Sequence, residues 1–203
     1  MIMSEVDFYY TIDRAGQAEF KDRGSKFIAL AFHIQNIGDF KNALETCKKE
    51  HPKANHHCFA YRIGLDGNTF RVSDDGEPSG TAGKPILGQI DSKQITDVLI
   101  VVVRYFGGTL LGVPGLINAY KTVAALVLQT TPVVQKSIEI KYNLQFDYTV
   151  MNDVMHILKQ YNSTIINKDI TLFCQFTVGI QKSRLEEVLY KLKDLQTVDV
   201  KKL

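Results

Sequence analysis

Hydrophobic and polar positions along the chain follow two periods, and each period predicts one kind of element. Apolar and polar residues alternate from Phe8 to Ile12, which predicts a strand. Residues 26–34 and 96–106 are more continuous apolar runs, and the second, the most hydrophobic of all, is expected to be the central strand. Residues 58–64 read as a further strand, followed by a hairpin built on Asp66-Gly67.

Three segments in the first two thirds of the chain have the spacing of helices. Residues 39–51 place apolar side chains on one face of a helix. A short helix is expected over residues 81–90 with Thr81 near its N-cap, and a long helix over 114–130 with Pro114 at its first position. We therefore expect an α+β protein.

The pattern changes after residues 130–137, which look like a domain boundary, so we predict domains at 1–134 and 135–203. The second domain reads as strand, helix, two strands, helix and strand, in the order βαββαβ of a ferredoxin-like fold. The expected elements are residues 140–150, 151–162, 163–169, 170–180, 182–195 and 197–203. The two middle strands are expected to pair through a turn at Lys168-Asp169.

Composition is that of an ordinary globular protein, with 45% hydrophobic and 23% charged residues among 203. The net charge is only +2, so an RNA contact would need a local basic patch. Three cysteines without paired spacing suggest reduced thiols in the cytoplasm. The acidic start does not resemble a signal peptide, and Val98–Val103 is too short to span a bilayer, so no membrane association is expected.

The segment "VSDDGEPSGTAGKP", residues 72–85, is the first candidate for chemistry. Asp74, Asp75 and Glu77 are carboxylates close enough to bind Mg²⁺ or to supply a general base. Equally, Asp74-Asp75-Gly76 is typical turn chemistry, and we favour that interpretation.

The second half of this segment runs into a helix start, which favours anion binding. Backbone N–H groups beside Ser79, Gly80, Thr81 and Gly83 would face the anion, and Lys84 would add a positive charge. The spacing of a Walker A loop is absent, so this is not a nucleotide-binding loop of that kind.

A second glycine-rich loop follows the central strand in "RYFGGTLLGVPG". Arg104 at the strand end is suited to bind phosphate, and Gly107-Gly108 turn sharply. Tyr105 and Phe106 either stack on a base or fill the core, and core packing is the commoner role. If the two glycine-rich loops meet in space, they form one composite site.

Histidines cluster in "HPKANHHC", at His51, His56 and His57, with Cys58 beside them. Their spacing matches no usual zinc motif, so we expect no metal site. On a strand His56 and Cys58 would share one face, with His57 opposite, and Cys58 is expected to be a buried thiol rather than a nucleophile.

The motifs "DRGSKFIA", "HPKANHHCFAYRIG", "SDDGEPSGTAGKPIL" and "VVVRYFGGTLLG…GLINAY" together resemble the Impact family, the YigZ-like proteins. The resemblance covers about Arg23 to Tyr120. It implies an N-terminal domain with the fold of the second domain of ribosomal protein S five, and a tandem similar to the last two domains of elongation factor G. It also implies a role in translation, since eukaryotic relatives regulate it and bacterial members are usually suggested to bind nucleic acid or a ribosomal partner.

The chain departs from the family pattern at "GVPGLINAY", where Pro114 and Asn118 stand. Family members often carry arginine ahead of "AY", so Asn118 removes a positive charge from this face. Arg104, Lys84 and Lys121 remain as candidates for phosphate contacts.

We therefore expect a non-enzymatic cytoplasmic protein, without cofactor, that binds RNA or a ribosome-associated protein and has a role in regulating translation. The alternative is an enzyme acting on a phosphorylated or nucleotide substrate. Its base or metal ligand would be Asp75 or Glu77, and the "GTAG" helix start would hold the anion.

Overall fold

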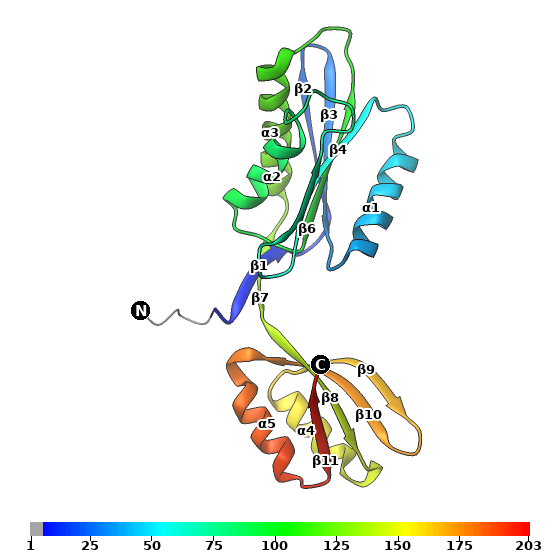
Figure 1. Ribbon diagram of the computed structural model, residues 1–203, viewed down its shortest axis with the longest axis vertical. Coiled ribbons are helices and arrows are strands. Elements are labelled where there is room, and N and C mark those ends of the chain that lie inside the picture. Colours follow the sequence, from blue (N-terminus) through cyan, green and yellow to red (C-terminus); the bar gives the residue numbers. More distant parts are fainter. Residues whose placement is uncertain (1–5) are drawn as a thin grey trace. The chain divides into compact units, whose positions relative to one another are not determined.

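The computed structural model describes residues 6–203, which form a mixed α/β fold of two units (Figure 1). One unit is Tyr9–Lys136, and the other combines residues 6–8 with Ser137–Leu203. Residues 6–8 thus belong to the unit that the chain joins again at Ser137, two residues after the boundary expected from the sequence (136 against 134). Residues 1–5, part of the start that does not resemble a signal peptide, lie outside the described residues.

The N-terminal unit is built on a five-stranded sheet with the order β2-β3-β6-β4-β5, in which all neighbours are antiparallel. Its strands are β2 (Gly16–Asp22), β3 (Ser25–His33), β4 (His56–Ile63), β5 (Thr69–Ser73) and β6 (Val98–Tyr105). Strand β6 lies between β3 and β4, which confirms that the most hydrophobic run is the central strand. Strands β1 (Phe8–Ile12) and β7 (Val133–Ser137) form a separate two-stranded sheet.

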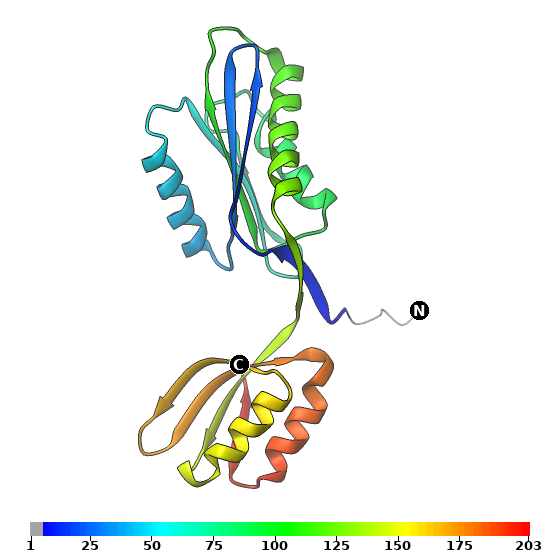
Figure 2. The same cartoon turned by 180° about the vertical axis from the view of Figure 1, so that it is seen from behind.

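Helices cover both faces of this sheet (Figures 1 and 2). The even-numbered residues of 98–102 join the core beneath α2 (Gly83–Ser92) and α3 (Gly112–Thr130). The odd-numbered residues of 99–103 join a second core beneath α1 (Ile37–Glu50). Because successive side chains of a strand point to opposite faces, a strand buried on both sides has no polar positions, and this accounts for the apolar run.

The C-terminal unit has a four-stranded antiparallel sheet with the order β11-β8-β10-β9. In chain order its elements are β8 (Glu139–Phe146), α4 (Met151–Gln160), β9 (Thr164–Ile170), β10 (Cys174–Gln181), α5 (Leu185–Asp194) and β11 (Val198–Lys202). Alternate apolar residues of β8 and β10 pack in one core with residues of both helices. The predicted order of elements is therefore present.

Two details of this unit differ from expectation. Lys168 and Asp169 do not form the turn; they lie inside β9, opposite Phe176 and Gln175 of β10. Strand β9 is an exposed edge strand. Its solvent-facing charged residues give it the same composition as a turn. The expected strand over residues 140–150 ends at Phe146, because Asp147 accepts hydrogen bonds from the Thr149 N–H and hydroxyl and begins a short 3₁₀ turn.

Among residues 6–203, none of the helices has the length and apolar character required to span a membrane.

Candidate functional site

The two glycine-rich loops meet through one buried ion pair. Nη1 of Arg104, at the end of β6, donates to Oε1 of Glu77 at 2.6 Å. Arg104 is 5% and Glu77 9% exposed, so the pair is shielded from solvent. The condition for a composite site, that the two loops lie together, is fulfilled.

Asp74 accepts the backbone hydrogen bonds at the start of α2. The N–H groups of Gly80, Ala82 and Gly83 donate to its carboxylate at 2.8, 2.9 and 2.9 Å. Burial alone would raise the pKa of Asp74, but these bonds outweigh it and hold the pKa below its ordinary value. Thr81 lies next to Ala82, the N-cap residue of α2, as expected. Its hydroxyl donates to the Pro78 carbonyl at 2.7 Å, so the capping carboxylate is that of Asp74.

This geometry bears on the anion site predicted at residues 79–84. The amides of Gly80 and Gly83 already face a carboxylate from the same chain, so an external phosphate would have to compete with Asp74. Ser79 and Lys84 are exposed, and the positive charge of Lys84 acts on Asp74. The binding roles of these residues stay predictions.

The three carboxylates of the loop do not form a metal centre. Asp74 binds the start of α2, Asp75 accepts from the backbone N–H of His57 at 2.6 Å, and Glu77 pairs with Arg104. In the part of the chain that the structure describes, no three His, Cys, Asp or Glu side chains are grouped to hold a metal ion. Asp74 therefore acts as a helix cap and Glu77 as the partner of Arg104.

A buried polar network extends from Glu77 into the core. The hydroxyl of Tyr120 on α3 donates to Glu77 Oε1 at 2.7 Å. The Cys58 thiol lies 3.3 Å from that hydroxyl and 3.0 Å from the carbonyl of Asp74. Burial raises the pKa of both Tyr120 and Cys58, so both stay protonated, and the expectation of a buried thiol is confirmed.

The Arg104 guanidinium is also fixed on its other sides. Nη2 donates to the Ser25 hydroxyl at 3.3 Å, and the group lies over the rings of Phe27 and Phe106, 5.4 and 5.6 Å from their centroids. A phosphate at Nη1 would compete with Glu77, whereas the buried Nε has no hydrogen-bond partner among the described residues. Tyr120 and Ser25 were not predicted as site residues, although both lie within motifs that carry the family resemblance.

Gly107 and Gly108 shape the loop after β6. A side chain at Gly107 would overlap the backbone of Gly24, and the Gly107 N–H donates to Ser25 Oγ at 3.2 Å. Gly108 has φ +85°, a conformation that favours glycine. Close packing of two turns, rather than an open set of amides, explains Gly107.

An open pocket of about 370 Å³ lies beside the ion pair. Its apolar wall comprises Pro78, Phe106, Leu110, Leu111, Val113 and Leu116. Its polar end comprises Asn55, His56, Glu77 and Arg104. Leu110 is 83% and Phe106 46% exposed, so an exposed apolar patch adjoins the pocket, and such patches mark interaction sites.

The histidines separate as strand geometry predicts. His56 lies on the side of Cys58, and its Nδ1 is 2.8 Å from the Asp75 carbonyl while its Nε2 is 3.9 Å from Glu77 Oε1. His51 Nδ1 is 2.9 Å from the Tyr105 hydroxyl, which places these two rings together. Burial lowers the pKa of His57, which keeps its ring neutral.

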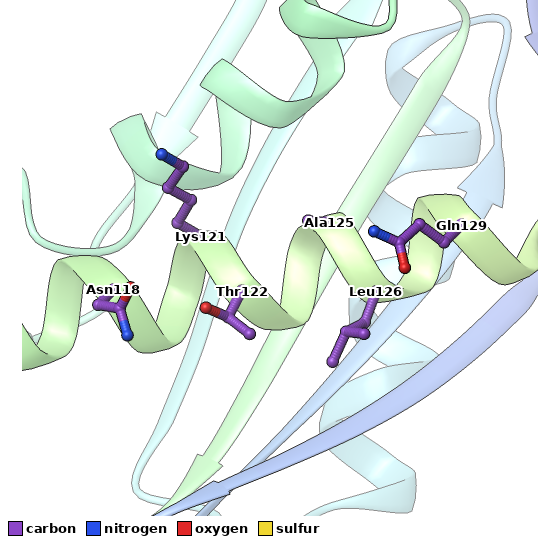
Figure 3. Close-up of a pocket in the computed structure, with 6 residues that line it drawn as sticks. All are labelled: Asn118, Lys121, Thr122, Ala125, Leu126 and Gln129. Carbon is purple, nitrogen blue, oxygen red and sulfur yellow. The ribbon is translucent and has the colours of Figure 1, made fainter.

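Lys121 does not line the 370 Å³ pocket. It lies on the exposed side of α3, at a shallower hollow of about 220 Å³ that is lined by this helix alone (Figure 3). In Figure 3 its side chain points away from Thr122 and Leu126. Lys121 therefore lines a different hollow from the one lined by Arg104.

Comparison with known proteins gives a family and a shared fold. The Impact N-terminal domain matches residues 23–128. The chain is 36% identical over 172 residues to "IMPACT family member YigZ" of Escherichia coli, covering 84% of each protein. A solved structure described as "Crystal structure of an hypothetical protein" is 31% identical with a TM-score of 0.79, covering 98% of both chains. A two-domain translational regulator, Yih1, matches 60% of this chain and 47% of its own at 28% identity, and its TM-score of 0.36 is too low to transfer any property.

Proposed function

This chain belongs to the IMPACT family, and from that premise we propose that it is a non-enzymatic cytoplasmic protein that binds RNA or a ribosome-associated protein of the translation machinery. The binding surface is the one formed by residues 74–84 and 104–113. The family membership confirms the resemblance inferred from the motifs.

One observation carries the choice of binding over catalysis. Each carboxylate of the acidic loop is already engaged within the protein: Asp74 by three amides, Asp75 by the His57 amide, and Glu77 by Arg104 and Tyr120. The same loops surround an open pocket with exposed large apolar side chains, the usual mark of a surface that receives a partner.

Co-sedimentation of the full chain with purified ribosomes, and titration with total RNA, at two salt concentrations tests this proposal. Binding through phosphates weakens steeply with salt, and Lys84→Ala is expected to weaken it further. Lys93→Ala, an exposed lysine at the other end of α2, is the matched control and should bind as wild type. Absence of binding to both ribosomes and RNA at low salt would overturn the proposal.

The enzyme alternative rests on the polar end of the pocket. His56 Nε2 and Glu77 Oε1 are 3.9 Å apart next to Arg104, an arrangement suited to proton transfer near an anion. Turnover of nucleotides and phosphate esters by wild type, absent in His56→Gln with its fold intact, would favour it. The engagement of the "GTAG" amides by Asp74 counts against the anion site that this alternative needs.

For the fold we propose the finer assignments as well. The order β8-α4-β9-β10-α5-β11, with strands arranged β11-β8-β10-β9, supports a ferredoxin-like C-terminal unit. The family membership supports an N-terminal unit like the second domain of ribosomal protein S five, and a tandem similar to that of elongation factor G.

A further inference from the structure

We propose that the 370 Å³ pocket receives a single unpaired nucleobase of an RNA strand, which stacks on Phe106 and hydrogen-bonds to Asn55 and His56. This inference rests on the proposed function and narrows it. It assigns the pocket to the base, and leaves phosphate contacts to lysines outside it.

The wall of the pocket suits a flat ring. Phe106 and Leu110 both line the pocket; Phe106 is about half exposed and Leu110 is 83% exposed. The Phe106 ring already contacts one planar group, since the Arg104 guanidinium lies over it at 5.6 Å from the ring centroid. Aromatic side chains and arginine planes are the platforms on which proteins stack single-stranded bases.

The polar end of the pocket presents a donor and an acceptor whose orientations follow from their partners. Asn55 Oδ1 accepts from the backbone N–H of Phe106 at 2.8 Å, so its NH₂ group is the end left for a ligand. His56 Nδ1 faces the Asp75 carbonyl at 2.8 Å and must carry a proton, so in the neutral ring Nε2 is an acceptor. The edge of a nucleobase carries both complementary groups.

A purely aliphatic side chain from a partner protein fits the same wall less well. It would bury the Asn55 amide and the His56 ring nitrogen against hydrocarbon, and polar groups buried without hydrogen bonds are destabilising. A base fills the apolar part and satisfies the polar end together.

Charge excludes the phosphate from the pocket itself. Arg104 is the cation of the lining, and Glu77 neutralises it at 2.6 Å. A neutral ligand group is therefore the complementary one, whereas a phosphate would meet the Glu77 carboxylate without a free positive charge to offset it. Lys84, on the exposed side of the first turn of α2, lies outside the lining and is available to the backbone of the strand.

The test compares two fluorophore-labelled single-stranded oligoribonucleotides of equal length and charge, one with bases and one abasic throughout, by fluorescence anisotropy with the full chain. We expect the base-bearing strand to bind at least about 10-fold more tightly. Phe106→Ala should remove that difference. Phe70→Ala is the matched control, since Phe70 is 51% exposed and also lies under an arginine, Arg62, 5.2 Å from its ring centroid, but does not line the pocket.

Three results would overturn the inference, and they separate it from the proposed function. Equal binding of both strands, unchanged in Phe106→Ala, would leave an RNA binder without a base pocket. Binding of a purified ribosomal protein instead of RNA, lost in Phe106→Ala, would assign the pocket to a protein partner and preserve the proposed function. No binding to RNA, ribosomes or their purified proteins would remove both.

Discussion

The two units of the chain bury different kinds of side chain. In residues 6–203, the buried polar and charged residues all belong to the N-terminal unit; they are Thr11, Ser25, Glu77, Thr81, Thr96, Asp97, Arg104 and Thr131. The core of the C-terminal unit consists of apolar residues from its sheet and its two helices. Both units have a complete core, so the polar groups are not needed simply to make a stable fold.

This difference indicates where function resides. Burying a charged pair requires desolvation that its attraction only partly offsets, so such a pair is weak evidence for stability. In this chain Glu77 and Arg104 instead hold two loops together and form the polar end of the pocket. We infer that this unfavourable burial is retained in the N-terminal unit because the pair shapes its binding surface. The C-terminal unit, which has no such surface in this proposal, buries no charged pair among its described residues.

The largest expected effect comes from removing one member of the buried pair. Arg104→Met leaves the Glu77 carboxylate buried without its cation, and the free energy of unfolding should fall by about 3–5 kcal/mol. Arg184→Met, in the exposed pair with Glu187 of the C-terminal unit (3.2 Å), should change it by less than about 1 kcal/mol. Urea denaturation followed by circular dichroism measures both.

A second variant sharpens this result. Glu77→Met combined with Arg104→Met removes both charges, and we expect it to recover part of the stability, because the buried Tyr120 hydroxyl still loses its acceptor Glu77. The RNA binding proposed for this surface should weaken. If Arg104→Met and Arg184→Met destabilise the protein equally, the buried pair does not distinguish the two units.

Glycines give the next largest difference. Gly107→Ala forces a methyl group into the backbone of Gly24, which cannot yield easily, so a loss of about 1–3 kcal/mol is expected. At Gly179 in β10 the same methyl group would overlap the carboxylate of Glu139, a flexible side-chain end that can rotate away at the expense of one exposed hydrogen bond from Thr164. Thermal denaturation should show a clear decrease in Tm for Gly107→Ala and little change for Gly179→Ala; similar losses would contradict the close packing of the two turns.

Much of the fold could be predicted from the sequence, because burial on one or both faces leaves a local pattern. The central strand and the βαββαβ order followed from the period of apolar residues alone. The predicted turn at Lys168-Asp169 was wrong because an exposed edge strand and a turn have the same composition. The pattern of apolar and polar residues therefore predicts elements reliably where side chains pack in a core. It misleads on exposed strands, where packing does not restrict which residues occur.

The site was less predictable, because its contacts join residues far apart in the chain. Glu77 and Arg104 are 27 positions apart, and the register of β4 on β6 places His56 opposite Arg104. Asp74, Glu77 and Arg104 were all candidate site residues. Local sequence alone could not show that Glu77 pairs with Arg104 or that Asp74 caps α2, rather than that these residues bind a metal ion or a phosphate. Pairing of charges between loops is a property of the folded chain.

Replacing one aspartate in each unit should give a smaller difference in stability, and for Asp74 that difference should depend on pH. Asp74 accepts three backbone hydrogen bonds, and Asp74→Asn should reduce stability at pH 7 by about 1 kcal/mol. Asp147 in the C-terminal unit accepts only from Thr149 and is exposed, so Asp147→Asn should have a smaller effect.

The sign of the pH effect follows from the lowered pKa of Asp74. Its stabilisation is complete above the ordinary value of 3.8 and is lost as the pH falls through the lower pKa of the folded state. The difference in Tm between wild type and Asp74→Asn should therefore shrink below about pH 4. A difference that persists unchanged at acid pH would show that the carboxylate charge is not what stabilises the start of α2.

The smallest effect is expected on the edge strand of the C-terminal unit. All seven residues of β9 are exposed, and Ile166 is 48% exposed, so Ile166→Thr should change the free energy of unfolding by less than about 0.5 kcal/mol. Val178→Thr on β10 is the control, because it buries a hydroxyl in the apolar core and should destabilise by about 1–3 kcal/mol. Neither variant should alter the proposed RNA binding at a temperature where both are folded. If Ile166→Thr weakens ribosome binding while leaving stability unchanged, β9 is itself a contact surface, and binding would then be shared between the two units rather than confined to the one that buries charge.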